Sequence, residues 1–513
     1  MRPLALVALF VAANAGATNW PQFGFDAQHS AYNPAERGYA TANGQTIFIN
    51  GAAIPANVDQ APIFVEHVAT PSGLRDLLFG VTVDGALLAI DASNGAIVWS
   101  AQPTGAGTLT QSTPATDLQF VYAYGFDGKV HKYRISDGAE TLDDGWPQTV
   151  TLKPQFDKVA AGLTLATSPN GARHLYVVTN SYYDQKDFQG HLTTIDLDAG
   201  TQHLFNAQCS DFTSYFVANG ITQGAGQNDC PAIASGLMGE TANSGIWGRG
   251  GATYDARTDR VYIATGNGAF DPTNAQALGR DWGDSVLAFN ADGSTTNGTP
   301  LDSYTPSSYP ALLQNDADLG SMSPVVLPTP PASTRPHLGM QSGKDGCMRL
   351  LDFGNLSGTG GTGAIGGDLQ AMPLPGVPNH CVDGGNVSES KFSPAVWIDP
   401  STESTWLEVA HQTGFVAYEL VVDGAGKASL SARWSTSANG TSPVVANGIV
   451  YYVNSAIVRA VDARTGELIW NDTHLGRVHW ESPVVVNGRL YVFDEFSHLW
   501  AYRLDGVFRG GFE

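Results

Sequence analysis

Short apolar stretches that end at glycine-containing turns recur along the whole chain. The clearest one, residues 84–99, consists of two apolar strands joined at Asn94-Gly95, and residues 458–470 repeat this pattern with a Thr-Gly turn. Asn-Gly and related pairs tolerate the positive φ angles of tight hairpins. The apolar runs are also too short for amphipathic helices. Each repeat therefore predicts a β-hairpin.

A second pattern precedes most of these hairpins. A small residue followed by proline opens an apolar strand, as at Thr113-Pro114, Ser442-Pro443 and Ser482-Pro483. Two successive hairpins make one four-stranded antiparallel sheet, and eight such units cover the chain. Sheets repeated in this way form a β-propeller, whose closure protects the sheet edges. We predict an all-β fold, an eight-bladed β-propeller of four-stranded antiparallel blades.

Closure of the ring needs a strand from outside the last unit. Residues 482–505 contain apolar strands but no final strand with a tryptophan. We expect an N-terminal strand, residues 20–24, to close the last blade. Three of the other outer strands contain a tryptophan, namely Trp99, Trp434 and Trp470. These indoles are expected to pack between neighbouring blades and not to form a site.

The N-terminus has the pattern of a secretory signal peptide. Arg2 precedes an apolar run at residues 4–13, and Ala15-Gly16-Ala17 matches a cleavage site. The run is too short to span a bilayer, which needs about 20 residues. The first cysteine is Cys209, so no cysteine is available for an N-terminal lipid anchor. We expect a periplasmic or extracellular protein without a membrane span or lipid anchor.

The predicted organisation is a signal peptide, one domain and a short tail. The ranges are 1–17 for the signal peptide, 18–507 for the propeller, and 508–513 for the tail, with insertions near 206–246, 296–322 and 328–390.

Four cysteines in an oxidising compartment predict two disulfides. Three pairings are possible. Proximity in the sequence favours Cys209–Cys230 and Cys347–Cys381.

Composition narrows the possible functions. Hydrophobic residues make up 42% of the chain, which excludes a disordered protein. Asp and Glu total 48 against 26 Lys and Arg, a net charge of −22. Such a surface repels phosphate backbones, so we expect no nucleic-acid partner.

Several segments resemble a known superfamily. Residues 89–99 and 460–470 resemble the repeat of the pyrroloquinoline-quinone (PQQ) propellers, and residues 20–34 are similar to the start of several members. The superfamily includes quinoprotein alcohol dehydrogenases and non-catalytic propellers such as the outer-membrane-assembly lipoprotein. The resemblance implies the propeller fold, but a fold alone does not determine function.

Four residues match positions that carry the chemistry in the quinoprotein dehydrogenases. The resemblance implies that Trp247 stacks on the quinone, that Asn267 in Thr-Gly-Asn ligates calcium, and that Lys344 contacts the quinone. Asp318 is the closer match to the catalytic aspartate, which serves as base for the substrate hydroxyl. A lysine there would stabilise charge growing on the quinone oxygen.

Other family features are missing. The chain has no adjacent cysteine pair, and no arginine stands in residues 111–114, before the second blade. The calcium-ligating glutamate is also absent. Asp184 and Asp187 stand in its stretch, and the sequence does not choose between them.

Two functions from different classes follow. The missing residues favour a secreted binding or scaffold protein with no cofactor, which binds an unknown protein or small molecule on a propeller face. Trp247, Asn267, Asp318 and Lys344 favour the alternative, a PQQ- and calcium-dependent oxidoreductase that oxidises an alcohol.

Overall fold

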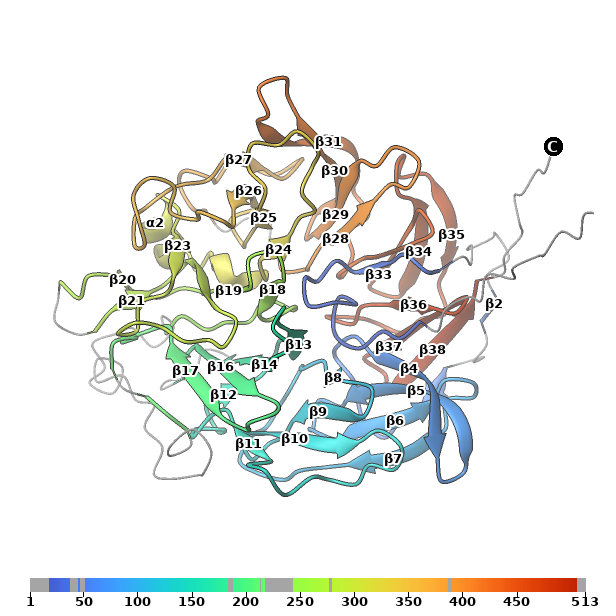
Figure 1. Ribbon diagram of the computed structural model, residues 1–513. Coiled ribbons are helices and arrows are strands. Elements are labelled where there is room, and N and C mark those ends of the chain that lie inside the picture. Colours follow the sequence, from blue (N-terminus) through green and yellow to red (C-terminus); the bar gives the residue numbers. More distant parts are fainter. Residues whose placement is uncertain are drawn as a thin grey trace, which may run out of the picture.

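Eight antiparallel sheets surround a common axis in the computed structural model (Figure 1). The structure describes residues 18–36, 45–46, 51–182, 188–212, 214–216, 243–275, 279–385 and 390–504. The sheets follow one another around the ring in chain order, and blade 8 lies beside blade 1, where β36 contacts β4. The predicted eight-bladed β-propeller is confirmed.

Blades 1 to 4 occupy the first part of the chain, and each begins with its innermost strand. Their strands are β4 (Ile63–Thr70), β5 (Gly73–Val81), β6 (Leu87–Asp91) and β7 (Ile97–Ala101); β8 (Ala115–Thr116), β9 (Phe120–Tyr124), β10 (Lys129–Arg134) and β11 (Gln148–Thr149); β13 (Thr164–Thr167), β14 (Arg173–Val178), β16 (His191–Asp196) and β17 (Gln202–Asn206); and β18 (Thr253–Asp255), β19 (Arg260–Ala264), β22 (Val286–Asn290) and β23 (Asp302–Tyr304).

Blades 5 to 8 follow the same plan. Their strands are β24 (Val325–Val326), β25 (Leu338–Gln341), β26 (Cys347–Asp352) and β27 (Gln370–Pro373); β28 (Ala395–Ile398), β29 (Thr405–His411), β30 (Gly414–Val422) and β31 (Ala428–Thr436); β32 (Val444–Ala446), β33 (Ile449–Asn454), β34 (Ile457–Asp462) and β35 (Leu468–Asp472); and β36 (Val484–Val486), β37 (Arg489–Asp494) and β38 (His498–Arg503).

Short elements lie between and outside these strands. Two small sheets pair β12 (Asp157–Lys158) with β15 (Asn180–Ser181) and β20 (Phe270–Asp271) with β21 (Asp281–Trp282). A helix, α2 (Tyr309–Gln314), and a 3-10 turn, η1 (Leu319–Ser321), lie in the predicted insertion at 296–322. The predicted insertion around 328–390 contains three strands of blade 5.

The hydrophobic core lies between neighbouring blades. One buried cluster joins Leu77 and Phe79 of blade 1 to Val121 of blade 2, and a second joins Tyr176 of blade 3 to Tyr254 of blade 4. A sheet with both faces covered buries consecutive side chains, which explains the continuous apolar strands of the sequence.

The outer tryptophans pack across the gaps between blades, as predicted. Trp99 Nε1 donates to the Ile135 carbonyl oxygen of blade 2 at 3.0 Å, and Trp434 Nε1 donates to that of Ala463 in blade 7 at 2.9 Å. A Cβ atom on Gly466, whose φ is +72°, would lie only 2.5 Å from the Trp434 ring. The repeated Thr-Gly turn therefore serves two purposes, a tight hairpin and a seat for the indole.

An N-terminal strand closes the last blade, but not the one expected. β2 (Gln45–Thr46) and β3 (Ala52–Ala53) pair with β38 on the outside of blade 8. Trp20, in the segment expected there, instead pairs with Phe64 of β4, on the inside of the ring. The expectation was wrong because a tryptophan marks the outer strands of other blades, whereas Trp20 is 1% exposed at the axis.

Residues 20–33 form a hub inside the ring (Figure 1). This hub hydrogen-bonds the second residue of the innermost strand in seven blades. These residues are Phe64, Thr116, Leu165, Tyr254, Val396, Val445 and Val485. An innermost strand has no neighbouring strand on its axial side, and an unpaired buried amide or carbonyl is costly. The hub supplies the missing partners.

The disulfide Cys347–Cys381 is present, as predicted, and fits an oxidising compartment. The predicted partner of Cys209, Cys230, lies outside the described residues, as do the signal peptide and the tail. No helix among the described residues is long and apolar enough to cross a membrane.

The hub makes a prediction about stability. Trp20→Ala should lower the free energy of unfolding by about 3–5 kcal/mol, because it removes a fully buried indole from the axis. Guanidinium denaturation monitored by circular dichroism measures the change. The control is Phe496→Ala, whose side chain is 63% exposed and should cost no more than about 0.5 kcal/mol. Equal effects of the two substitutions would contradict a stabilising hub.

Candidate functional site

The loops that lead into the innermost strands meet at one end of the ring axis. Five of them carry a charged, amide or aromatic residue at the same position, four residues before the strand begins. These residues are Asp59, Gln111, Arg249, Lys391 and Trp480. Because every blade starts with its innermost strand in the same direction, these positions lie at one level. Together with Trp247, Asn267, Asp318, Lys344 and Lys158 of β12, they form what we call the axial site.

Two indoles and three cations contact one another in this site. The Trp247 and Trp480 rings meet edge to face, with centroids 6.5 Å apart. Lys391 Nζ lies 5.9 Å from the centroid of each ring. Lys344 Nζ lies 5.4 Å from the Trp247 centroid, and Arg249 Cζ lies 5.2 Å from that of Trp480. Such separations allow cation–π attraction.

The structure brings the four residues singled out by the sequence into one chain of contacts. The Asn267 backbone amide donates to Asp318 Oδ1 at 2.7 Å, and Lys344 Nζ contacts Asp318 Oδ2 at 2.6 Å. Lys344 Nζ also lies 3.1 Å from Asp316 Oδ1, and it faces Trp247 as described. Residues from blade 4, blade 5 and the loops that precede them therefore converge.

Local sequence explains this close approach. Asn267 follows β19, and Asp318 precedes η1. A Cβ atom on Gly266 would lie 2.4 Å from Asp318 Oδ1, and one on Gly343 would lie 2.7 Å from the Asp318 carbonyl oxygen. Glycine is thus required on both sides of Asp318, in the Thr-Gly-Asn and Gly-Lys pairs.

One atom of the site is buried without a partner. Asn267 Oδ1 has no hydrogen-bond partner among the described residues, although its Nδ2 donates to Asp316 Oδ1 at 3.2 Å. Buried polar atoms are rarely left unpaired. A ligand atom that donates a hydrogen bond or carries positive charge would satisfy this oxygen.

Charge is balanced around Lys344. Burial alone would lower the pKa of the Lys344 ammonium, but Asp318 and Asp316 outweigh burial, and the net effect raises the pKa. The lysine therefore stays protonated at neutral pH. Burial and the nearby Asp318 carboxylate also raise the pKa of Asp284 well above its usual range.

A second network lies across the axis, around Gln111. Lys158 Nζ donates to Gln111 Oε1 at 2.9 Å, and Arg249 Nη2 donates to the Gln111 carbonyl oxygen at 2.7 Å. Gln111 Nε2 donates to Asp59 Oδ2 at 2.7 Å. Burial lowers the pKa of Arg249 to about 10. Residues 111–114, which lack the family's arginine, therefore contact two cations from elsewhere in the chain, Lys158 of β12 and Arg249.

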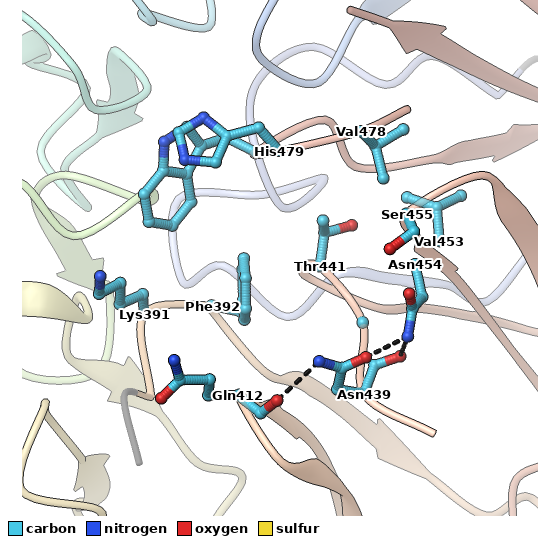
Figure 2. A pocket seen from close by; sticks show the side chains of 12 residues that line it. Lys391, Phe392, Gln412, Asn439, Thr441, Val453, Asn454, Ser455, Val478 and His479 are labelled. Carbon is cyan, nitrogen blue, oxygen red and sulfur yellow. Dashed lines mark hydrogen bonds between the residues drawn. The ribbon is translucent and has the colours of Figure 1, made fainter. Parts of the chain in front are cut away.

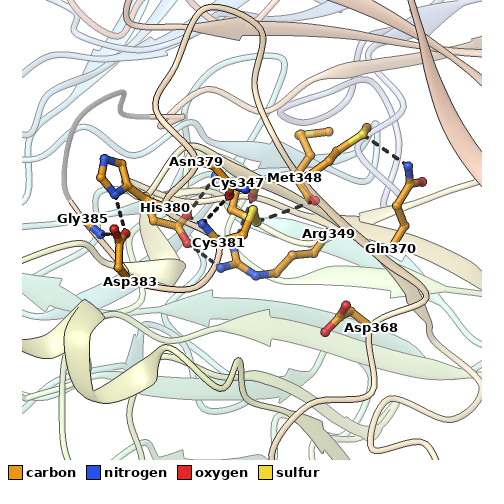
Figure 3. Close-up of a disulfide and its surroundings, with 12 residues drawn as sticks. Cys347, Met348, Arg349, Asp368, Gln370, Asn379, His380, Cys381, Asp383 and Gly385 are labelled. Atoms are coloured by element: carbon orange, nitrogen blue, oxygen red, sulfur yellow. Dashed lines mark hydrogen bonds and ion pairs between the residues drawn. A yellow bond between two sulfur atoms is a disulfide. The ribbon is translucent and has the colours of Figure 1, made fainter.

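The disulfide Cys347–Cys381 lies close to the turn that carries Lys344. It joins the first residue of β26 to the loop that carries His380 and Asp383 (Figure 3). The Cys347 amide donates to Asp345 Oδ1 at 3.1 Å, and Arg349 pairs with Asp345. Arg349 and Asp345 are each 1% exposed. This buried pair and the disulfide fix the turn that presents Lys344.

Calcium ligation by Asn267 remains a prediction. Calcium takes six to eight oxygen ligands, and the described residues contain no group of three or more acidic, histidine or cysteine side chains that could hold a metal ion. Asp184 and Asp187, the candidates for the missing glutamate, lie outside the described residues.

Sequence reasoning missed Arg249, Lys391, Trp480, Asp59 and Lys158 as members of the site. A usable signal was present for most of them. Lys391 and Trp480 each stand two residues before a Ser-Pro pair, Gln111 stands two before Thr-Pro, and Asp59 stands two before Ala-Pro.

Substitution of Asp284 tests the buried carboxyl group. In the unfolded chain Asp284 ionises near 3.8, whereas burial raises its pKa well above this value in the folded protein, so its contribution to stability is lost as pH rises above 3.8. Asp284→Asn removes this loss. The free energy of unfolding of the variant, relative to wild type, should therefore increase between about pH 4 and pH 7.

Urea denaturation across this pH range measures the difference. Asp143 is exposed, and Asp143→Asn is the matched control that should follow the wild-type profile. A constant difference between Asp284→Asn and wild type would refute the protonated state.

The disulfide gives another prediction. A Cys347→Ser/Cys381→Ser double variant should lose about 3–4 kcal/mol of unfolding free energy, because the bond closes a loop with a sequence separation of 34. Guanidinium unfolding without reductant measures the loss. A loss under about 1 kcal/mol would show that the bond does not constrain this region.

Comparison with known proteins places the fold. Over 96% of this chain and 81% of the other, it matches quinohemoprotein alcohol dehydrogenase ADHIIG from Pseudomonas putida HK5, with 14% identity and a TM-score of 0.63. The quinohemoprotein alcohol dehydrogenase from Comamonas testosteroni matches with 14% identity over 97% of this chain and 82% of the other (TM-score 0.61). A europium-containing methanol dehydrogenase matches with 13% identity over 93% and 89% (TM-score 0.60).

These identities show a shared fold and do not establish a shared activity. No curated protein has significant sequence similarity to the chain. A family model described as outer membrane protein assembly factor BamB matches residues 11–219 and 420–507, more than half of the sequence. The chain therefore belongs to this family of PQQ-like β-propellers.

Proposed function

We propose that the axial site binds a planar organic anion. The observation that carries this proposal is the gathering of four cationic side chains, Lys158, Arg249, Lys344 and Lys391, beside two indoles. The whole chain has a net charge of −22, so these cations are a local exception. Converging cations attract and orient an anion, and indole rings offer flat apolar surfaces to an aromatic one.

A PQQ-type quinone fits this site better than a simple inorganic anion does. PQQ is flat, aromatic and anionic, which suits indoles flanked by ammonium and guanidinium groups. Asn267 Oδ1, an acceptor, and Arg249 Nε, a donor, are both buried and lack partners among the described residues, so a ligand that pairs both must carry a donor as well as an acceptor. A small anion would not reach both networks, whereas a fused ring system with polar groups at several edges would.

The residues of the site suit oxidation of an alcohol. A bound quinone would supply the hydride acceptor. Asp318 would accept the proton of the substrate hydroxyl, and Lys344 would stabilise negative charge on an oxygen of the ligand. Asp318 Oδ2 already contacts Lys344 at 2.6 Å, so a substrate hydroxyl would share or replace this contact. The predicted signal peptide and the observed disulfide support a location outside the cytoplasm.

A second candidate is a binding or scaffold protein without redox chemistry. The matching family model is described as an outer membrane protein assembly factor, which favours this role. The ion pairs of Lys344 with Asp318 and Asp316 also give the site an internal balance of charge that needs no ligand.

Titration with PQQ, with and without calcium, separates the two candidates. Wild-type protein should bind the quinone stoichiometrically with a shift of its absorption spectrum and should reduce a dye in the presence of an alcohol. Lys344→Gln should weaken PQQ binding by about tenfold or more, since a hydrogen bond to a charged group contributes roughly 1.5–3 kcal/mol.

The matched control is Lys427→Gln, at an exposed position in blade 6, which should bind PQQ as wild type does. Thermal unfolding must first show that both variants are folded. Absence of saturable binding under both conditions would exclude the quinone and leave the scaffold role.

A further inference from the structure

A pocket of about 230 Å³ opens beside the axial site, where blades 6, 7 and 8 meet (Figure 2). Lys391 and Trp480 belong to both the pocket and the axial site. The other lining residues come from loops of the three blades, and the four residues matched to the dehydrogenases are not among them. The pocket is therefore a separate cavity with a shared wall.

One side of the pocket is aromatic and apolar. Phe392 packs against Trp480 with ring centroids 5.5 Å apart, and Val453 and Val478 add to the lining. These side chains offer a surface for a ligand face composed of C–H groups.

The other side presents amides and hydroxyls. Figure 2 shows Asn439, Asn454 and Ser455 across the pocket from Phe392 and His479. Asn439 Nδ2 donates to the Gln412 carbonyl oxygen at 2.6 Å, and Asn454 Nδ2 donates to the Asn439 carbonyl oxygen at 2.8 Å. These bonds hold both carboxamides in fixed orientations before any ligand arrives, which reduces the entropic cost of binding.

A buried hydroxyl in the lining has no partner. Thr441 is 3% exposed, and its Oγ1 makes no hydrogen bond to any described residue. In Figure 2 its side chain lies in the middle of the lining set. An unpaired buried hydroxyl costs free energy, and a ligand hydroxyl would satisfy it because a hydroxyl both donates and accepts.

We propose that this pocket binds an uncharged sugar ring. A pyranose has faces of C–H groups, which suit Phe392 and Trp480, and a rim of hydroxyls, which suits Thr441, Asn439 and Asn454. No carboxylate lines the pocket, so nothing there selects a cation. Its volume is below the roughly 300–1,000 Å³ of sites for drug-sized molecules, which limits the ligand to about one monosaccharide unit.

The proposal does not depend on a quinone at the axial site. A sugar bound here could be the end of a glycan or a free monosaccharide, and both present the same ring. The ligand proposed for this pocket is an uncharged sugar, whereas the ligand proposed for the axial site is an anion.

Isothermal titration calorimetry of the full-length mature protein tests the proposal. The probes are D-glucose, D-galactose, D-mannose and N-acetyl-D-glucosamine, each also as its methyl glycoside, with cyclohexanol as the ring that lacks the hydroxyl rim. At least one sugar should bind saturably and more tightly than cyclohexanol. A methyl glycoside that binds more tightly than its free sugar would identify a glycan end as the source.

Thr441→Val keeps the shape of the side chain and removes its hydroxyl. It should weaken sugar binding by about 3- to 10-fold, the effect of one neutral hydrogen bond. The matched control is Thr473→Val, at an exposed position in blade 7, which should bind as wild type does. If Thr441→Val does not fold, Gln412→Ala replaces it, because Gln412 lines the pocket and is exposed.

Three results would overturn the proposal. They are no saturable binding of any sugar, cyclohexanol binding as tight as that of the sugars, and unchanged binding by the folded pocket variant. None of them bears on PQQ binding, so the two proposals fail independently.

Discussion

The structure depends on one constraint, the need of the innermost strands for hydrogen-bond partners on their axial side. Within each blade the strands pair with one another, but the axial edge of the innermost strand has no partner in its own sheet. The hub meets the need at the same register position in seven blades. Five of these positions donate their backbone amides to backbone carbonyl oxygens of the hub, so the arrangement depends little on the side chains of the strands.

This constraint also sets the level of the functional residues. Lys391 and Trp480 stand five residues before Val396 and Val485, the positions that bond to the hub. A short loop with one end fixed at the axis can place its side chains in few ways. The hub therefore positions the axial site although it contributes none of the residues that define the site.

Much of the fold could be predicted because each repeat carries its own physical signal. The glycine turns, the apolar strands and the tryptophans that pack on Gly138 and Gly466 all act within one blade or between neighbours. The closing strand was assigned to the wrong residues because its choice depends on contacts between chain ends. Trp20 has the residue type of an outer strand, and only its place at the axis shows its role.

The site was predictable where a motif spans a few residues and not where residues from distant loops meet. Trp247, Asn267, Asp318 and Lys344 were singled out because short motifs around them resemble those of the quinoprotein dehydrogenases, and they lie together. Arg249 and Lys158 are held by Gln111, which is 138 residues from one and 47 from the other. No local sequence pattern predicts such a contact, whereas the spacing from the Ser-Pro pairs would have identified Lys391 and Trp480.

The placement of the acidic residues affects the charge of the axial site. Most carboxylates lie where water screens them, and some that are fully buried avoid charge, since burial raises the pKa of Glu408 and Glu481 well above the usual range. The carboxyl groups near the axial cations include Asp318 and Asp316 beside Lys344, and Asp59 and Glu481 near Arg249. An anion at the axial site would meet a local group of cations on a chain whose net charge is −22.

The shared wall of Lys391 and Trp480 links the two cavities physically. Lys391 Nζ lies 5.9 Å from the centroid of each indole, so this lysine takes part in the axial site as well as in the pocket lining. The Trp480 backbone amide donates to Asp59 Oδ1 at 3.0 Å, which fixes the loop backbone at this position. Because Lys391 and Trp480 belong to both cavities, any effect of one ligand on the other would by linkage have the same size in both directions.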